Sequence, residues 1–348
     1  MRARLSFIAV IAASMRRALI FVLGAFGFAL AATPQPPSAQ AMIEALTRAN
    51  AAVVGVQVTA AEGARSADTL GRRRDGSGVV IGPDGLILTI GYLMLEADTI
   101  QVVTQDNRTL PARAVAYDLA TGFGLVKPLL PLRGINPVPL GSHTDVSPGQ
   151  GLMVASGGSD GDIITTRLVS KRPFSGYWEY HIEAALFTSP PIPNHSGAPL
   201  FNQRGELIGI GSLFVADALG EAPRIPGNMF VPVDLLKPIL AEMQQTGTSR
   251  QSRRPWLGLS STEQSGRVQV VRVTAGSPAQ AGGIEAGDVV LAVDGVGVAT
   301  LEEFYKRLWS HANPDDEIVL TVLQGAQVKT MTLRAVDRMS TMTKPAGI

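Results

Sequence analysis

The chain of 348 residues contains no cysteine. Disulfide bonds, thiolate metal sites and cysteine nucleophiles are therefore excluded. Histidine is scarce too: there are four, none in an H-x-x-x-H spacing, so the sequence predicts no metal site and no cofactor. The chain also lacks an excess of one charge, because 30 basic residues balance 29 acidic ones. We expect no nucleic-acid partner, since phosphate binding needs a basic face.

Aromatic residues make up only 5% of the chain, whereas glycine (37) and proline (23) are abundant. This composition favours many short strands joined by turns over a helical bundle. The length suffices for two or three domains with a sizeable core. We therefore expect a mainly β protein.

The N-terminal segment, residues 1–41, has the features of a signal peptide or membrane anchor. Arg16 and Arg17 precede an apolar run over residues 18–30, and small residues follow it. The run is short for a membrane span, which needs about 20 residues. We expect the body of the protein to be exported, which in a bacterium means the periplasm.

The start and the cleavage site of this segment stay open. Ala39-Gln40-Ala41 fits an A-x-A cleavage site, and Ala29-Leu30-Ala31 competes with it. A second apolar stretch over residues 5–13 lies upstream, so translation could start at Met1 or at Met15. A start at Met1 favours an uncleaved anchor in the inner membrane.

Residues 190–200 read P-P-I-P-N-H-S-G-A-P-L and lie between two apolar, strand-like runs. Here Ser196 is followed by two small residues and a proline. Small neighbours let a substrate backbone approach, and a tight turn directs backbone N–H groups at the reacting carbonyl. The pattern indicates a nucleophile loop, with a serine in an ordinary tight turn as the alternative.

This loop resembles the G-N-S-G-G-P-L loop of chymotrypsin-like serine proteases, in the form used by the HtrA/Deg family of periplasmic proteases. The resemblance implies a trypsin-like domain over residues 42–244, folded as a chymotrypsin-like double six-stranded β-barrel. Residues 76–89 match the family hairpin that delivers the catalytic histidine, and Tyr92 occupies the histidine position. Residues 118–127 match the segment of the catalytic aspartate, and Gly122 occupies its position.

The resemblance thus implies a degenerate catalytic triad around Ser196. A phenol with a pKa near 10 stays protonated at neutral pH, so Tyr92 cannot replace a histidine base. Gly122 has no side chain to orient a base. The family glycine that helps to form the oxyanion hole is replaced by Asn194, which reaches left-handed conformations less freely. We therefore expect a catalytically inactive homologue.

Other bases have little support in the sequence. His195 adjoins Ser196, and neighbouring side chains in extended or sharply turned backbone point apart. His181 and His143 fall on loops far from the triad positions and are expected to be surface histidines, and Lys127 matches a strand-end lysine. An active serine endopeptidase that uses Ser196 with a non-standard base stays as the alternative, as does chaperone-like holding.

A polar linker, residues 245–254, is followed by a second domain over residues 255–337 and a tail over residues 338–348. The domain resembles PDZ domains, a β-sandwich with short helices, because residues 277–295 match the PDZ core and residues 301–309 form an amphipathic helix. The resemblance implies a peptide-binding loop formed by Trp256, Leu257, Gly258 and Leu259.

In that loop a peptide would add as a strand to the sheet edge, and its terminal carboxylate would meet backbone N–H groups. The resemblance therefore implies peptides or protein C-termini as partners, in envelope protein quality control or scaffolding. It also implies a homotrimer, the usual state of the family. Membrane contact is expected only through residues 1–41, if they are not cleaved.

Overall fold

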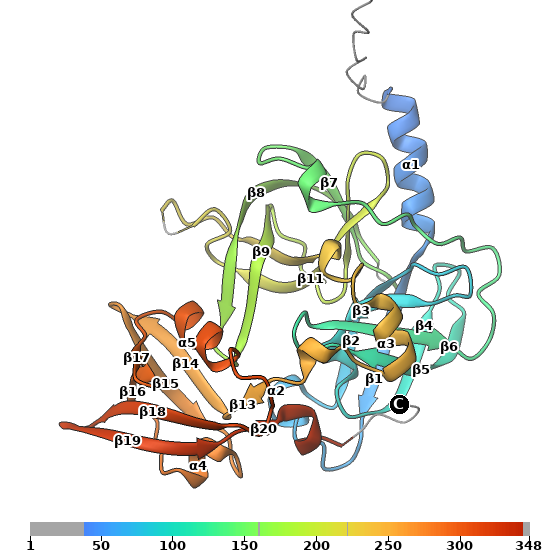
Figure 1. Ribbon diagram of the computed structural model, residues 1–348. Helices are drawn as coiled ribbons and strands as arrows, with labels where there is room; N and C mark the ends of the chain where they lie inside the picture. The colour runs from blue at the N-terminus through green and yellow to red at the C-terminus, as the bar shows by residue number, and fades with distance from the viewer. Residues whose placement is uncertain (1–37, 159–160, 221, 344–348) are drawn as a thin grey trace, which may run out of the picture. The chain divides into compact units, whose positions relative to one another are not determined.

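In the computed structural model, which describes residues 38–158, 161–220 and 222–343, β-strands form two closed barrels of six strands each (Figure 1). The first barrel has the strand order β1-β2-β3-β6-β5-β4. Its strands are β1 (Val53–Ala60), β2 (Arg73–Val80), β3 (Ile87–Ile90), β4 (Ala97–Val103), β5 (Thr109–Tyr117) and β6 (Phe123–Pro128). The predicted double six-stranded barrel is confirmed.

The second barrel has the strand order β10-β11-β12-β9-β8-β7. Its strands are β7 (Gly151–Ala155), β8 (Ile163–Gly176), β9 (Tyr180–Ser189), β10 (Pro199–Phe201), β11 (Leu207–Val215) and β12 (Gly227–Pro232). Strands β8 and β9 are the longest of this barrel, and they form a hairpin whose tip lies at residues 177–179. This tip reaches the C-terminal domain, as described below.

Local turn chemistry explains the first hairpin. Strands β2 and β3 pair with Gly78 opposite Thr89, as predicted. The turn between them needs a left-handed residue, and Gly85 supplies it with a φ of 80°. The chain leaves β3 directly into a 3₁₀-helix, η1 (Gly91–Met94), which carries Tyr92.

The C-terminal domain is a sheet of strands in the order β14-β15-β16-β18-β19, with β17 paired to β16. Strand β14 therefore forms one edge of this sheet. The elements are β13 (Pro255–Trp256), β14 (Leu259–Gln264), β15 (Arg267–Val273), α4 (Pro278–Ala281), β16 (Val289–Val293), β17 (Val296–Gly297), α5 (Leu301–Leu308), β18 (Glu317–Gln324), β19 (Gln327–Arg334) and β20 (Val336–Asp337). Strands β13 and β20 pair with each other.

Helix α5 begins at a capping box, in which Thr300 accepts from the Glu303 N–H and Glu303 accepts from the Thr300 N–H. The helix ends one residue before the predicted end, with Trp309 as its C-cap. Its buried face consists of Leu301, Phe304, Tyr305 and Leu308. This apolar face at helical spacing was predicted, and it closes the core of the domain.

The predicted signal or anchor lies almost wholly outside the described residues. Ser38 caps helix α1 (Ala39–Ala51), which contains the Ala39-Gln40-Ala41 site in its first turn. The remaining helices are α2 (Ala67–Leu70), α3 (Leu240–Thr246), η2 (His143–Asp145), η3 (Val233–Leu235), η4 (Arg250–Ser252) and η5 (Arg338–Thr341). No helix in the described part of the chain is long and apolar enough to cross a membrane.

Residues 245–254, predicted as a polar linker, are packed on the first barrel. Helix α3 continues to Thr246, and Ser249 and Ser252 are buried. In the predicted tail, Thr343 donates its backbone N–H to the Glu96 carboxylate at 3.0 Å. Residues 245–254 and the described part of the tail, residues 338–343, are therefore attached to the barrel.

Candidate active site and PDZ ligand loop

The loop that carries Ser196 is held between the two barrels. The Ser77 N–H of β2 donates to the Ser196 carbonyl oxygen at 2.8 Å, and the Gly197 N–H donates to the Gly211 carbonyl oxygen of β11 at 2.8 Å. Gly197 has a φ of 74°, and a Cβ there would lie 2.1 Å from the Ser77 carbonyl oxygen. Only glycine fits this close approach, so the small residue after the serine is required for the geometry.

The beginning of the same loop is fixed by side chains of the second barrel. The Asn228 amide of β12 accepts from the Ile192 N–H at 2.7 Å and donates to the Ile192 carbonyl at 3.2 Å. The Thr166 hydroxyl of β8 donates to the Pro190 carbonyl at 2.9 Å. Asn228 is fully buried, so this anchor is shielded from water.

Tyr92 contacts Ser196 directly. Its hydroxyl lies 2.7 Å from the Ser196 Oγ and 3.0 Å from the Ser212 carbonyl oxygen, both within hydrogen-bond distance. Burial raises the pKa of Tyr92 to about 12, and the hydrogen bond with Ser196 opposes this only in part. At neutral pH the group beside the serine is therefore a neutral phenol, which does not take up the serine proton.

The turn that carries Tyr92 is fixed by Arg74, the last residue of a polar stretch, residues 60–74, that the sequence predicts as a solvated loop. The structure corrects this, because Arg74 is 5% exposed and its guanidinium donates to the carbonyl oxygens of Leu95 at 2.7 Å and Tyr92 at 3.2 Å. A buried guanidinium with several carbonyl acceptors holds the backbone rigidly. The Tyr92 hydroxyl is thus held within hydrogen-bond distance of the Ser196 hydroxyl.

Gly122 lies beside the Tyr92 turn, since its carbonyl oxygen accepts the Gly91 N–H at 2.7 Å. It has a φ of 82°, which side chains rarely adopt. A Cβ at this position would lie 3.1 Å from the Tyr180 hydroxyl oxygen, and that hydroxyl donates to the Thr121 carbonyl at 2.6 Å. The structure therefore places Tyr92 beside Ser196 and Gly122 beside the Tyr92 turn, and these are the three positions that the sequence predicts as a degenerate triad.

Asn194 and His195 lie on the outer side of the loop. Asn194 is exposed, and the residue is not among those with a positive φ in the described part of the chain. The His195 Nδ1 lies 2.9 Å from the Pro193 carbonyl oxygen, and burial lowers the pKa of His195. Within the described residues no hydrogen bond joins His195 to Ser196.

The other candidate bases have partners elsewhere. His143 pairs with Asp234 at 2.7 Å, and Lys127 pairs with Asp84. His181, predicted as a surface histidine, has a side chain that is only 5% exposed, so that prediction is wrong. Its Nδ1 lies 2.9 Å from the Ser175 hydroxyl.

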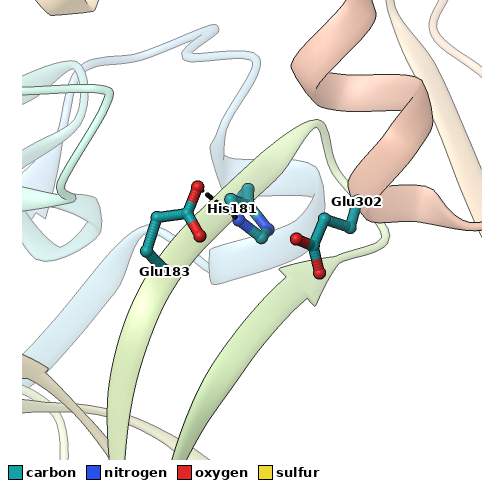
Figure 2. A group of neighbouring side chains, drawn as sticks. All are labelled: His181, Glu183 and Glu302. Carbon is teal, nitrogen blue, oxygen red and sulfur yellow. Dashed lines mark ion pairs between the residues drawn. The ribbon is translucent and has the colours of Figure 1, made fainter.

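His181 also belongs to a cluster with Glu183 and Glu302, whose ligand atoms all lie within 4.8 Å of one another (Figure 2). Such a group could hold a metal ion. However, the Lys306 ammonium lies 2.8 Å from the Glu183 carboxylate and 2.6 Å from the Glu302 carboxylate. This cation already contacts both acids, so we interpret the cluster as ion pairs that join β9 to α5.

A buried hub at Asp118 was not singled out as important from the sequence. Its carboxylate accepts hydrogen bonds from the Thr121 N–H at 2.8 Å, the Thr121 hydroxyl at 2.6 Å, the Ser252 hydroxyl at 2.6 Å and the Ser249 hydroxyl. Ser252 also accepts the Leu119 N–H at 2.6 Å. The hub fixes the turn before Gly122 to the segment that follows α3.

In the PDZ-type domain, three consecutive backbone N–H groups converge on one carboxylate. Those of Leu257, Gly258 and Leu259 donate to Glu179 at 3.1, 2.8 and 2.8 Å. Trp256 instead lies in β13 and pairs with β20. Burial raises the pKa of Glu179 to about 7, against the effect of these hydrogen bonds. No sequence pattern pointed to Glu179, which lies at the tip of the β8–β9 hairpin with a φ of 59°.

Comparison with known proteins agrees with this architecture. The trypsin-like peptidase domain family matches residues 76–210, and the PDZ domain family matches residues 255–334. The chain is 26% identical over 277 residues to HhoB of Synechocystis sp., which carries the name of a serine protease, covering 74% of this chain and 65% of the relative. It is 28% identical over 282 residues to a DegP-like periplasmic serine endoprotease of Halomonas elongata, covering 76% and 57%.

These alignments thus span less than two thirds of either relative. Among solved structures, the HtrA-type protease AlgW with a tripeptide matches with a TM-score of 0.53 at 21% identity, covering 85% of this chain and 96% of that one. The serine endoprotease from Yersinia pestis matches with a TM-score of 0.52 at 22% identity, covering 87% and 99%. The chain is therefore a homologue of the HtrA and DegP-like proteases, with a trypsin-like peptidase domain followed by a PDZ domain.

Proposed function

We propose that this protein is a catalytically inactive HtrA-like protein that captures peptides or protein C-termini through its PDZ domain. The observation that supports inactivity is the Tyr92 hydroxyl 2.7 Å from the Ser196 Oγ. Losing the base of a serine-protease triad costs about a millionfold in turnover, or about 8 kcal/mol of transition-state stabilisation. The fold of a protease is retained here without a group that activates the serine.

The proposed setting is the bacterial periplasm, in envelope protein quality control or in a scaffold. Periplasmic location is supported by the name of the DegP-like relatives and by the signal-like character of residues 1–41. A homotrimer is proposed from the family resemblance. These assignments follow from similarity, so the two experiments below address the chemistry of the chain itself.

We expect Ser196 to be unreactive toward a fluorophosphonate, because the side chain that contacts its hydroxyl is a neutral phenol and, within the described residues, no base is hydrogen-bonded to it. Intact mass spectrometry of the purified protein after incubation should show an unchanged mass, while an active DegP-like protease treated in parallel gains the adduct. Stoichiometric labelling that is lost in Ser196→Ala would contradict the proposal. That result would support the alternative, an active serine endopeptidase with a non-standard base.

We expect the PDZ domain to prefer peptides with a free C-terminal carboxylate and an apolar last residue. The supporting observation is the convergence of the Leu257, Gly258 and Leu259 N–H groups on a carboxylate. Fluorescent decapeptides ending in leucine, valine or phenylalanine should bind more than about tenfold more tightly as acids than as amides, since charge-assisted hydrogen bonds are lost in the amide. Equal affinities by fluorescence anisotropy would count against peptide capture.

A further inference from the structure

The carboxylate at the PDZ loop belongs to the chain itself. Glu179 is fully enclosed and lies at the tip of the β8–β9 hairpin of the second barrel. Its two carboxylate oxygens accept the N–H groups of residues 257–259, one oxygen taking Leu257 and the other taking Gly258 and Leu259. A main-chain carboxylate at the end of a bound peptide would need the same donors. The site that would recognise a C-terminus is therefore filled.

The backbone of the tip also continues the PDZ sheet. Strand β14 lies at the sheet edge, and its Ser261 N–H donates to the Tyr177 carbonyl at 2.9 Å. This is the kind of main-chain bond through which a peptide adds as an extra strand to an edge. The hairpin tip thus supplies both a side-chain carboxylate and a strand contact.

Helix α5 binds the other side of the tip. The Tyr305 hydroxyl donates to the Gly176 carbonyl at 2.7 Å and accepts the Glu179 N–H at 3.3 Å. The Tyr305 ring stacks on Trp309 with centroids 5.2 Å apart, and the Arg254 guanidinium lies 3.5 Å above Trp309. Residues 176–179 are therefore held between β14 and α5, which are the two walls of a PDZ peptide groove.

We propose that residues 176–180 are an internal ligand of the PDZ domain, in which the Glu179 carboxylate takes the place of a peptide C-terminus. An incoming peptide with a free carboxylate binds only by displacing this hairpin tip. The apparent affinity of the peptide is then its intrinsic affinity multiplied by the fraction of molecules in which the hairpin tip has left the loop of residues 257–259. This inference rests on the proposed peptide capture for its consequence, but the internal contact itself can be measured without a peptide.

The first test compares the wild type with Glu179→Gln in the full chain. A glutamine offers one acceptor oxygen in place of two, so its NH₂ group would face at least one of the three N–H donors and the tip would hold the loop less tightly. Glu285→Gln, an exposed glutamate of the same domain, is the matched control. The acid decapeptides should bind Glu179→Gln at least about tenfold more tightly than the wild type or the control. Equal measurable affinity for all three proteins would overturn the proposal.

The second test needs no ligand. Hydrogen exchange of the Leu257, Gly258 and Leu259 amides, followed by mass spectrometry or NMR, should be at least about tenfold faster in Glu179→Gln than in the wild type, with Glu285→Gln unchanged. Unchanged exchange in Glu179→Gln would overturn the proposal. If no protein binds peptide but exchange accelerates as expected, then the proposed capture fails and the internal ligand stands.

Discussion

Replacing Tyr92 with histidine and Gly122 with aspartate together is expected to give at most weak cleavage of casein. We expect a rate at least about 100-fold below that of an active DegP-like protease, because a missing oxyanion donor alone costs about 100- to 1000-fold. The structure adds a steric reason at the second site. An aspartate there would have to adopt a φ of 82° with its Cβ 3.1 Å from the Tyr180 hydroxyl oxygen.

Two further changes separate these causes. Adding Asn194→Gly to the double variant should raise the rate if the oxyanion hole limits it, and adding Tyr180→Phe should raise it if the aspartate is crowded. Ser196→Ala in each background is the control for contaminating protease. If the double variant already matches the active protease, the oxyanion hole is intact and our interpretation of the serine loop is wrong.

Asp118→Ala is expected to lower the free energy of unfolding by about 3 to 5 kcal/mol, since each buried polar group left without a partner costs about 1–3 kcal/mol. The substitution would strand the Thr121 N–H and hydroxyl and the hydroxyls of Ser249 and Ser252, all of them buried. Because Asp118 joins the turn before Gly122 to the segment after α3, we expect the variant to lose the hydrogen bonds that attach this segment to the first barrel.

Urea denaturation followed by far-UV circular dichroism measures this effect. Asp98→Ala, an exposed aspartate of β4, is the matched control and should stay within about 0.5 kcal/mol of the wild type. A loss of less than about 1 kcal/mol in Asp118→Ala would show that solvent or rearranged partners satisfy the stranded groups.

The sequence by itself determined the architecture. The turn at residues 82–85 and the capping box of α5 each depend on residues close together in the chain. The serine loop and the PDZ loop are likewise contiguous motifs, so their residues could be predicted from the sequence. That Tyr92 and Gly122 replace a base and its orienting acid is a prediction from matches of short segments, and the structure places the Tyr92 hydroxyl beside the Ser196 Oγ.

Contacts between distant segments could not be read in this way. Arg74 is buried because it binds the Tyr92 turn, and Ser249 and Ser252 are buried because they bind Asp118. These partners lie up to 134 positions apart in the sequence. Polar residues such as these look solvent-exposed in sequence, because their partners are chosen by the packing of whole elements. The prediction of a solvated surface was therefore wrong for Arg74, Ser249 and Ser252, while Arg72 and Arg73 are exposed as expected.

Only the tertiary structure decided what occupies the PDZ loop. Glu179 is a single acidic residue in a turn, 78 to 80 positions before the three N–H groups that it binds. Its role depends on the length of the β8–β9 hairpin and on the position of the PDZ edge strand against the hairpin tip. Sequence identifies a carboxylate-binding loop from local pattern, whereas the identity of the carboxylate is a consequence of how the two domains pack.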